Sequence, residues 1–165
     1  MKIFGIVGWK NSGKTGLMER LVTEITTRGF TVSTIKHAHH SFDVDHPGRD
    51  SYRHRAAGAS EVMLASGNRW ALMHELRDED EPEFEALLAR MSPVDLILVE
   101  GYKRETHAKI ECFRDGVSDP LRMHEDKTIC AVATDTDVGG LDVPIFDLNN
   151  TTAIADFILK HQGLT

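Results

Sequence analysis

Short apolar runs and one amphipathic stretch open the chain. Residues 2–7 form an apolar run with β-branched members that ends in glycine, which predicts a buried strand followed by a turn. From residue 14 to residue 25 apolar side chains recur at helical spacing, and Gly29 is placed to end this helix. Residues 31–35 predict a second strand, so the chain opens with a βαβ unit.

The rest of the chain continues this alternation. The run 94–99 is strongly hydrophobic, as expected of a central parallel strand, and residues 61–65 and 70–76 predict an antiparallel hairpin around Gly67-Asn68. The other expected elements are strands at 109–113, 128–133 and 144–148, helices at 50–58 and 83–91, and a C-terminal helix with Asn150 or Thr151 as its N-cap.

Length and charge limit the classes of protein to consider. A chain of 165 residues with an average apolar content predicts a single domain over 1–165. The net charge of −7 argues against a nucleic-acid partner. The first residues, MKIFGIVG, do not show the charged leader followed by a long apolar stretch that is typical of a signal peptide. No apolar run reaches the ~18 residues of a membrane span, so we expect a cytoplasmic protein without a membrane partner. Cys112 and Cys130 are expected to be buried free thiols.

The strongest chemical signal is the segment GWKNSGKT at residues 8–15. It satisfies G-x-x-x-x-G-K-[ST] between a predicted strand and a predicted helix, which is the context of a phosphate-binding P-loop. Backbone N–H groups of such a loop surround phosphate oxygens, the lysine neutralises them, and the Thr hydroxyl ligates Mg²⁺. The nucleotide-binding residues predicted here are Asn11, Ser12, Gly13, Lys14 and Thr15, with Gly8 as a weaker candidate. The pattern therefore predicts an α/β P-loop NTPase fold, with a mostly parallel sheet flanked by helices and an antiparallel hairpin extension.

Magnesium bound at Thr15 also requires a carboxylate from a neighbouring strand. Glu100 ends the hydrophobic run 94–99, and this position predicts that it serves the metal together with Thr15. A carboxylate that merely ends a strand in solvent is the alternative.

The polar loop after the second strand holds His37, His39 and His40 together with several carboxylates. The histidines suggest a transition metal, although their spacing matches no compact zinc pattern. Asp43 and Asp45 are weaker candidates for Mg²⁺, and Asp50 for the nucleotide. Arginines and lysines that either hold an anionic ligand or lie at the surface are Arg49, Arg53, Arg55, Lys103, Arg104 and Lys109.

Asp135 follows the strand expected at 128–133. A carboxylate there can pair with the N1 and N2 donors of guanine, or can simply form a turn. Asp135 is therefore a further weak candidate for nucleotide binding.

Four strings together carry a resemblance to a known family: NSGKT (11–15), KHAHHSFDVDHPGRDSYRHRAAGA (36–59), RWALM (69–73) and DLILVEGYK (95–103). They resemble the MobB family, the adaptor proteins of molybdopterin-guanine dinucleotide synthesis. The P-loop is shared with many NTPases, whereas the KHxHHxFDxDxPGxDS string with VEGYK is far more particular.

The resemblance implies GTP and Mg²⁺ as cofactors, weak hydrolysis, and a homodimer joined partly through sheet extension. It also implies a MobA-type guanylyltransferase as partner, and it leaves open whether the molybdopterin cofactor binds directly. Thr15 and Glu100 would serve Mg²⁺, and residues 36–55 would be switch-like. No residue stands out as an efficient water-activating base, so the catalytic residues stay unassigned and the chain is at most a slow GTP hydrolase.

Two other functions remain open from the sequence. A small-molecule kinase would use Arg49, Arg53 and Arg55 as its lid. A nickel or zinc metallochaperone GTPase would use His37, His39 and His40.

Overall fold

The computed structural model describes residues 1–38 and 42–165, and the chain divides into two compact units. Unit 1 consists of Met1–Ala38 and Ser92–Thr165, and unit 2 of His39–Met91. The sequence predicts a single domain over 1–165. Whether the two units fold together as one domain stays a prediction.

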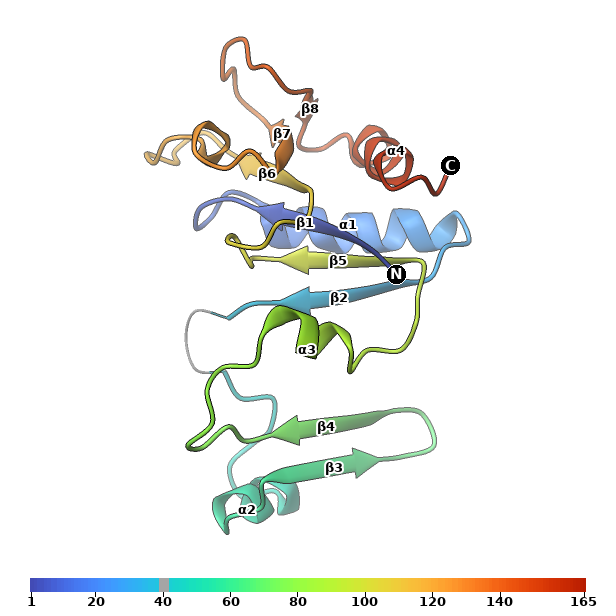
Figure 1. The fold of residues 1–165 in the computed structure, drawn as a ribbon, viewed down its shortest axis with the longest axis vertical. Coiled ribbons are helices and arrows are strands. Elements are labelled where there is room, and N and C mark those ends of the chain that lie inside the picture. The colour runs from blue at the N-terminus through green and yellow to red at the C-terminus, as the bar shows by residue number, and fades with distance from the viewer. Residues whose placement is uncertain (39–41) are drawn as a thin grey trace. The chain divides into compact units, whose positions relative to one another are not determined.

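Unit 1 is built on a six-stranded parallel sheet with the order β2-β5-β1-β6-β7-β8 (Figure 1). The first strand, β1, lies between β5 and β6, so the loop that follows β1 leaves the middle of the sheet. The strands are β1 (Lys2–Val7), β2 (Val32–Lys36), β5 (Leu96–Glu100), β6 (Lys109–Phe113), β7 (Ile129–Thr134) and β8 (Ile145–Asp147).

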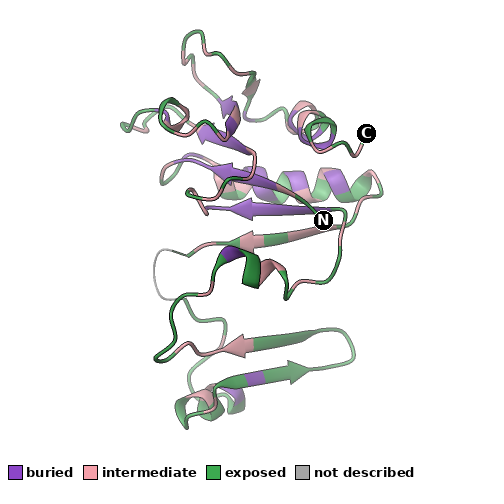
Figure 2. Ribbon diagram, viewed as in Figure 1, coloured by how far each residue is buried: buried purple, intermediate pink, exposed green. Residues whose placement is uncertain are grey.

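Helices α1 (Lys14–Thr27) and α4 (Thr151–His161) pack against each other on one face of this sheet. Their apolar sides and alternate strand residues form the main core, and Figure 2 shows β1, β5, β6 and β7 as largely buried. Arg20 of α1 joins the two helices, since its guanidinium donates to the carbonyl oxygen of Leu148 at 2.8 Å and to the hydroxyl of Thr151 at 3.0 Å. Asn150 is the N-cap of α4 and accepts from the N–H of Ala153, as predicted.

The other face of β6 buries charged side chains. Lys109 and Glu111 are both fully buried on it. The ammonium group of Lys109 donates to the carbonyl oxygen of Glu105 and to the hydroxyl of Thr128, and it lies 3.6 Å from a carboxylate oxygen of Asp126. Lys109 is therefore neither a surface cation nor a contact to a ligand, and both interpretations from the sequence are wrong. Its ammonium group is bound by these partners inside the protein.

Unit 2 contains the helices α2 (Asp50–Ala56) and α3 (Phe84–Leu88) and a two-stranded antiparallel sheet. Strands β3 (Glu61–Ala65) and β4 (Trp70–His74) form the predicted hairpin, in which Met63 pairs with Leu72. The extra two residues expected at the end of β4 are not in the strand.

Most expected elements are present, with differences at their ends. The strand expected at 94–99 begins only at Leu96, because Asp95 turns the chain by accepting from the N–H and hydroxyl of Thr31, both at 2.7 Å. Helix α3 is shorter than the expected 83–91, since Arg90 and Met91 bond to carbonyls three residues back and tighten the chain before Pro93. Cys112 is buried and Cys130 half-buried, and both are free. Within the described residues, no helix has the length and apolar content needed to span a bilayer.

Candidate functional site

The loop between β1 and α1 has the backbone of a tight, inward-turned cradle. Gly8 has φ +143°, Asn11 +63° and Gly13 +92°, and the N–H of Ser12 donates to the carbonyl oxygen of Trp9 at 3.3 Å. A Cβ atom at Gly8 would lie 2.4 Å from the carbonyl oxygen of Cys112 and 2.5 Å from the hydroxyl of Ser12. Only glycine fits this position, because both the torsion angle and the space exclude a side chain.

The loop has the features expected of an anion site. Helix α1 begins at Lys14, with Gly13 as its N-cap, no side-chain cap and no acidic residue in its first turn. Its first N–H groups and partial positive charge are therefore available to an anion. The Ser12 hydroxyl is buried and has no hydrogen-bond partner among the described residues. A buried polar atom of this kind is suited to bind a ligand atom.

Lys14 is held by its own loop. Its ammonium group donates to the carbonyl oxygen of Trp9 at 2.6 Å. Burial lowers the pKa of Lys14 and the charge of Lys36 lowers it further, while the charge of Glu100 acts in the opposite direction. A bound phosphate would therefore supply the negative charge that this half-buried ammonium group lacks.

Glu100 brings a carboxylate to the same end of the sheet. It ends β5 beside β1, is only 8% exposed, and lies with its Oε1 3.5 Å from the hydroxyl of Thr15. The ammonium group of Lys36 lies 3.2 Å from the same oxygen. The structure thus brings together Thr15 and Glu100, the predicted Mg²⁺ pair, and adds Lys36, which the sequence reasoning missed. Lys36 ends β2 next to Glu100 in the sheet register, and that topology was the signal for it.

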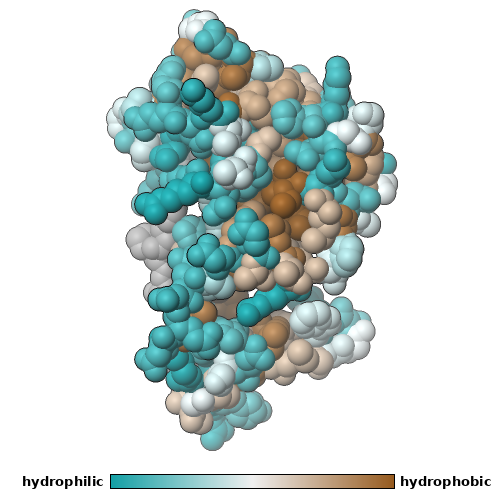
Figure 3. All heavy atoms as spheres, viewed as in Figure 1, coloured by the Kyte–Doolittle hydropathy of each residue, from teal (hydrophilic) through white to brown (hydrophobic). Residues whose placement is uncertain are grey.

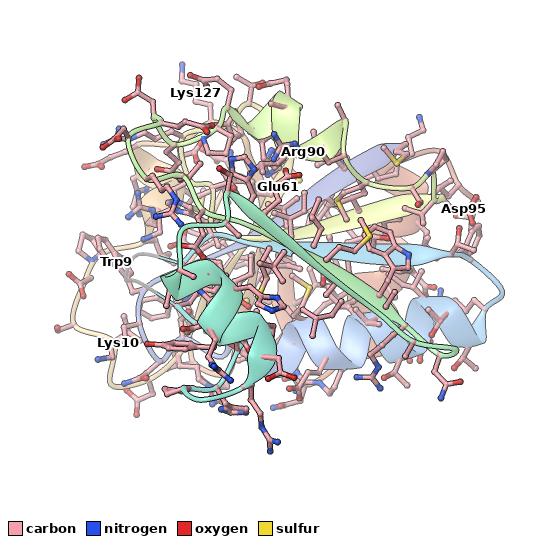
Figure 4. All side chains as sticks on the ribbon, turned by 90° about the horizontal axis from the view of Figure 1, so that it is seen from below. Trp9, Lys10, Glu61, Arg90, Asp95 and Lys127 are labelled. Atoms are coloured by element: carbon pink, nitrogen blue, oxygen red, sulfur yellow. The ribbon has the colours of Figure 1, made fainter. Side chains whose placement is uncertain are left out.

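The carboxyl ends of the parallel strands collect polar residues. Figure 4 places Trp9 and Lys10 at one end of the sheet and Asp95, which precedes β5, at the other. In Figure 3 hydrophilic residues cover the edge where β1, β5 and β6 end, on the left of that view. Ligands of parallel α/β sheets bind at this edge.

Asp135 lies at the end of β7 and is tied to the end of β6. Its carboxylate accepts from the Arg114 guanidinium at 3.1 Å and from the N–H of Asp115 at 3.2 Å. Arg114 in turn lies beside the loop, with its Nε 3.4 Å from where a Cβ of Gly13 would be. A cavity of about 470 Å³ lies next to Asp135, lined by Thr134–Asp137, Ile145–Asp147 and Asn149.

The remaining candidates lie in unit 2, where they pair with one another. The guanidinium of Arg55 lies 2.8 Å from Asp43, 3.7 Å from Asp45 and 2.8 Å from Glu75. Hydrogen bonds to Glu75 and to Asp43 raise the pKa of Arg55, and the pKa of Asp43 is lowered first by the backbone N–H of Asp45 and then by Arg55. Asp45 and Arg55 thus have structural partners within unit 2.

Asp50 is the first residue of α2, and its carboxylate lies 4.0 Å from Arg53. Whether Asp43, Asp45 and Asp50 serve the metal or the nucleotide stays a prediction. The described residues contain no group of three or more His, Cys, Asp or Glu side chains placed to hold a metal ion. His39 and His40 lie outside the described residues, and the ring of His37 packs on Tyr102 with centroids 4.8 Å apart.

A parallel sheet in which a G-x-x-x-x-G-K-[ST] loop, here residues 8–15, joins the first strand to a helix defines the class of P-loop NTPases. Residues 3–135 match the MobB family, described as Molybdopterin guanine dinucleotide synthesis protein B. The chain therefore belongs to the MobB family.

Individual relatives agree with this assignment. The chain is 44% identical over 161 residues to the molybdopterin-guanine dinucleotide biosynthesis adapter protein of Escherichia coli (strain K12), an alignment that covers 96% of the chain and 91% of the relative. It is 40% identical over 156 residues to the adapter protein of the same description from Haemophilus influenzae, covering 94% and 86%. A MobB protein homolog from Bacillus stearothermophilus, solved by crystallography, is 26% identical with a TM-score of 0.77 over 100% of both chains.

Proposed function

We propose that this protein is a GTP-binding adapter of molybdopterin-guanine dinucleotide biosynthesis, with weak GTP hydrolysis, that assists a MobA-type guanylyltransferase. Membership of the MobB family and the names of its relatives support the pathway. The single observation that carries the nucleotide site is the cradle of Gly8–Thr15, in which Gly8 leaves no room for a Cβ and the buried Ser12 hydroxyl has no partner among the described residues.

The residues of unit 1 fit a magnesium nucleotide. The N–H groups of residues 11–15 and the ammonium group of Lys14 would hold the phosphates. Thr15 and Glu100 would hold Mg²⁺, directly or through water, because hard oxygen donors suit this ion and theirs lie 3.5 Å apart. The ion would neutralise the phosphate charge.

The cavity at the ends of β7 and β8 is the natural place for the base. Arg114 links the loop to this cavity, since it lies against Gly13 and donates to Asp135. Both oxygens of Asp135 accept protein donors, which favours a structural role for this carboxylate. Asp137 lines the same cavity and uses its Oδ1 for the N–H of Gly139. We therefore assign the recognition of the guanine N1 and N2 donors to Asp137 rather than to Asp135.

A homodimer would use the outer face of the hairpin. Met63, Trp70 and Leu72 are 63%, 66% and 43% exposed, and strand alternation places them on one face. An apolar sheet face of this kind is a feature of protein interfaces.

Titration calorimetry with GTP and ATP, each with Mg²⁺, tests the nucleotide proposal. GTP is expected to bind more tightly than ATP, and its binding is expected to be strongly weakened in Lys14→Ala. Tighter binding of ATP, with a phosphorylated small molecule as product, would instead identify a kinase. For the adapter role, the test is whether the protein increases product formation by a MobA-type guanylyltransferase; an unchanged rate would rule that role out.

A further inference from the structure

Trp9 in the P-loop is contacted by two cations from separate segments of unit 1. The guanidinium carbon of Arg122 lies 4.7 Å from the centroid of the Trp9 ring, and the ammonium nitrogen of Lys103 lies 5.4 Å from it. The indole N–H donates to the carbonyl oxygen of Pro120 at 2.8 Å, which fixes the ring. Both distances are those of cation–π contacts. The Trp9 ring therefore holds two positively charged side chains next to the loop.

Lys103 reaches Trp9 because the chain reverses sharply after β5. Gly101 has φ +90° and Tyr102 has φ +46°. A left-handed conformation is strained for tyrosine, and such strain persists where the surrounding contacts enforce it. The contact here is with His37, whose ring packs on Tyr102 and whose Cβ would lie 3.1 Å from a Cβ at Gly101. The turn thus directs Lys103 back toward the loop.

Arg122 is placed by a buried carboxylate on β6. Glu111 is fully buried and accepts from the N–H of Arg122 at 2.9 Å and from that of Met123 at 3.0 Å. Burial raises the pKa of Glu111. These two bonds hold the backbone at Arg122 in place. The Nε of Arg122 is buried and has no hydrogen-bond partner among the described residues.

The two side chains add to a concentration of positive charge beside Lys14. The pKa of Lys103 is lowered by burial first, and then by the charges of Arg122 and Lys14. Within residues 1–38 and 42–165, the ion pairs found include neither Lys103 nor Arg122. Like charges held close together are stabilised by a bound anion, and a buried donor without an acceptor is costly.

We propose that Lys103 and Arg122, held against Trp9, form a second phosphate site beside the P-loop that binds a terminal, dianionic phosphate group. That group is either the γ-phosphate of the bound nucleotide or the phosphate monoester of a second ligand. The proposal rests on the proposed function, since it takes Gly8–Thr15 as the phosphate loop. Trp9 belongs to both sites, because its carbonyl oxygen accepts from Lys14 while its ring contacts the other two cations.

The fluorescence of Trp9 reads this site directly. The chain has two tryptophans, so Trp70→Phe leaves Trp9 as the sole reporter. In this background, Lys103→Met and Arg122→Met remove each charge while keeping an apolar stem over the ring. Arg104→Met is the matched control, because it removes an exposed positive charge next to Lys103. Each protein is titrated with GDP, with the non-hydrolysable analogue GMPPNP, and with inorganic phosphate in the presence of saturating GDP.

The titrations distinguish the two sources of the phosphate. If the site takes the γ-phosphate, Lys103→Met and Arg122→Met lower the affinity for GMPPNP by about tenfold or more. The affinity for GDP then changes by less than about threefold. If it takes a second ligand's phosphate, the ratio of GMPPNP to GDP affinity stays, and inorganic phosphate quenches Trp9 in GDP-loaded protein but not in these variants. The proposal is overturned when neither difference occurs. It is also overturned when Arg104→Met lowers the affinity, or the fluorescence response to phosphate, as much as Lys103→Met does.

One further variant separates this proposal from that of nucleotide binding. If GDP and GMPPNP do not bind the unsubstituted protein, nucleotide binding itself is refuted. Inorganic phosphate is then titrated into Lys14→Ala, which lacks the P-loop cation. A saturable change in Trp9 fluorescence that disappears with Arg122→Met supports the second site on its own, and its absence refutes that site as well.

Discussion

The ammonium group of Lys14 donates to the carbonyl oxygen of Trp9 at 2.6 Å, so the P-loop lysine is hydrogen-bonded to the backbone of its own loop. A bound phosphate would compete with this carbonyl for the lysine. The exchange favours phosphate, because a hydrogen bond between two charged groups is stronger than one to a neutral oxygen. The same contact also keeps the loop in shape while no ligand is bound.

Replacing Lys14 by alanine is expected to weaken GTP binding by roughly 10- to 100-fold or more, as expected for loss of a charged hydrogen bond of about 1.5–3 kcal/mol. The fold should persist, because Lys14 lies outside the main core. Calorimetry measures the affinity and circular dichroism the fold. Lys10→Ala is the control, since Lys10 is an exposed cation of the same loop, and a loss of affinity equal to that of Lys14→Ala would contradict a specific role.

Glu100→Gln tests the magnesium pair. Its carboxylate is buried beside the Thr15 hydroxyl and the Lys36 ammonium group, and an amide is a poorer ligand for Mg²⁺. The increase in GTP affinity that Mg²⁺ produces should fall by about tenfold, while affinity without the ion changes little. GTP titrations with Mg²⁺ and with EDTA measure both. The exposed Glu125→Gln serves as control, and an undiminished effect of Mg²⁺ in Glu100→Gln would remove Glu100 from the metal site.

Asp137→Asn tests how the base is read. A carboxylate accepts from the guanine N1 and N2 donors, whereas an asparagine amide can donate to the C2 carbonyl of xanthine. The substitution should therefore lower the affinity for GTP by about tenfold and raise that for XTP. Competition between the two nucleotides measures the ratio. Asp135→Asn should keep the preference for GTP, and a switch caused by this variant instead would return base recognition to Asp135.

The sequence predicts the site residues that a local motif or the end of a strand marks. It misses the residues that reach the site only through the order of the strands in the sheet. Residues 8–15 and Glu100 could be recognised because a motif and a strand end mark them. Lys36 joins Glu100 only because β2 lies beside β5, and Arg122 reaches Trp9 only because the buried Glu111 anchors its backbone.

The same distinction applies to the fold. Strand positions follow from short apolar runs, and β1, β3 and β6 begin and end at the predicted residues. The predicted start of β5 was wrong because the side chains of Thr31 and Asp95 form a hydrogen bond across the turn. Lys109 was misinterpreted because a lysine in an apolar run gives no sign that Asp126 and Thr128 will enclose it.

Leu72→Glu tests the proposed dimer. Leu72 pairs with Met63 on the exposed face of the hairpin, and a charge there would have to be buried in an interface. Sedimentation of the unsubstituted protein should show a dimer, and that of Leu72→Glu a monomer. Asn68→Glu adds the same charge at the exposed turn of the hairpin and should leave the dimer intact. A Leu72→Glu protein that stays dimeric would place the interface elsewhere.

His107 should make the stability of the fold depend on pH. Burial, together with the charge of Lys109, lowers the pKa of His107 to about 4, and Asp126 opposes this only in part. In the unfolded chain its pKa is near the ordinary value of about 6.5. Between these two values the unfolded chain binds more protons than the folded protein, so the free energy of unfolding falls as the pH is lowered from about 6.5 to about 4. Below that range both states are protonated, and the contribution of His107 no longer changes.

His107→Phe removes this titration while keeping a ring against Gly5, where the His107 Nε2 lies 2.7 Å from the position of a Cβ. The urea midpoint, measured from pH 4 to pH 7, should change less steeply with pH in this variant than in the unsubstituted protein. The exposed His124→Gln is the control and should keep the original slope. Equal slopes for His107→Phe and the unsubstituted protein would show that His107 does not resist protonation in the fold, and that other groups set the acid limit.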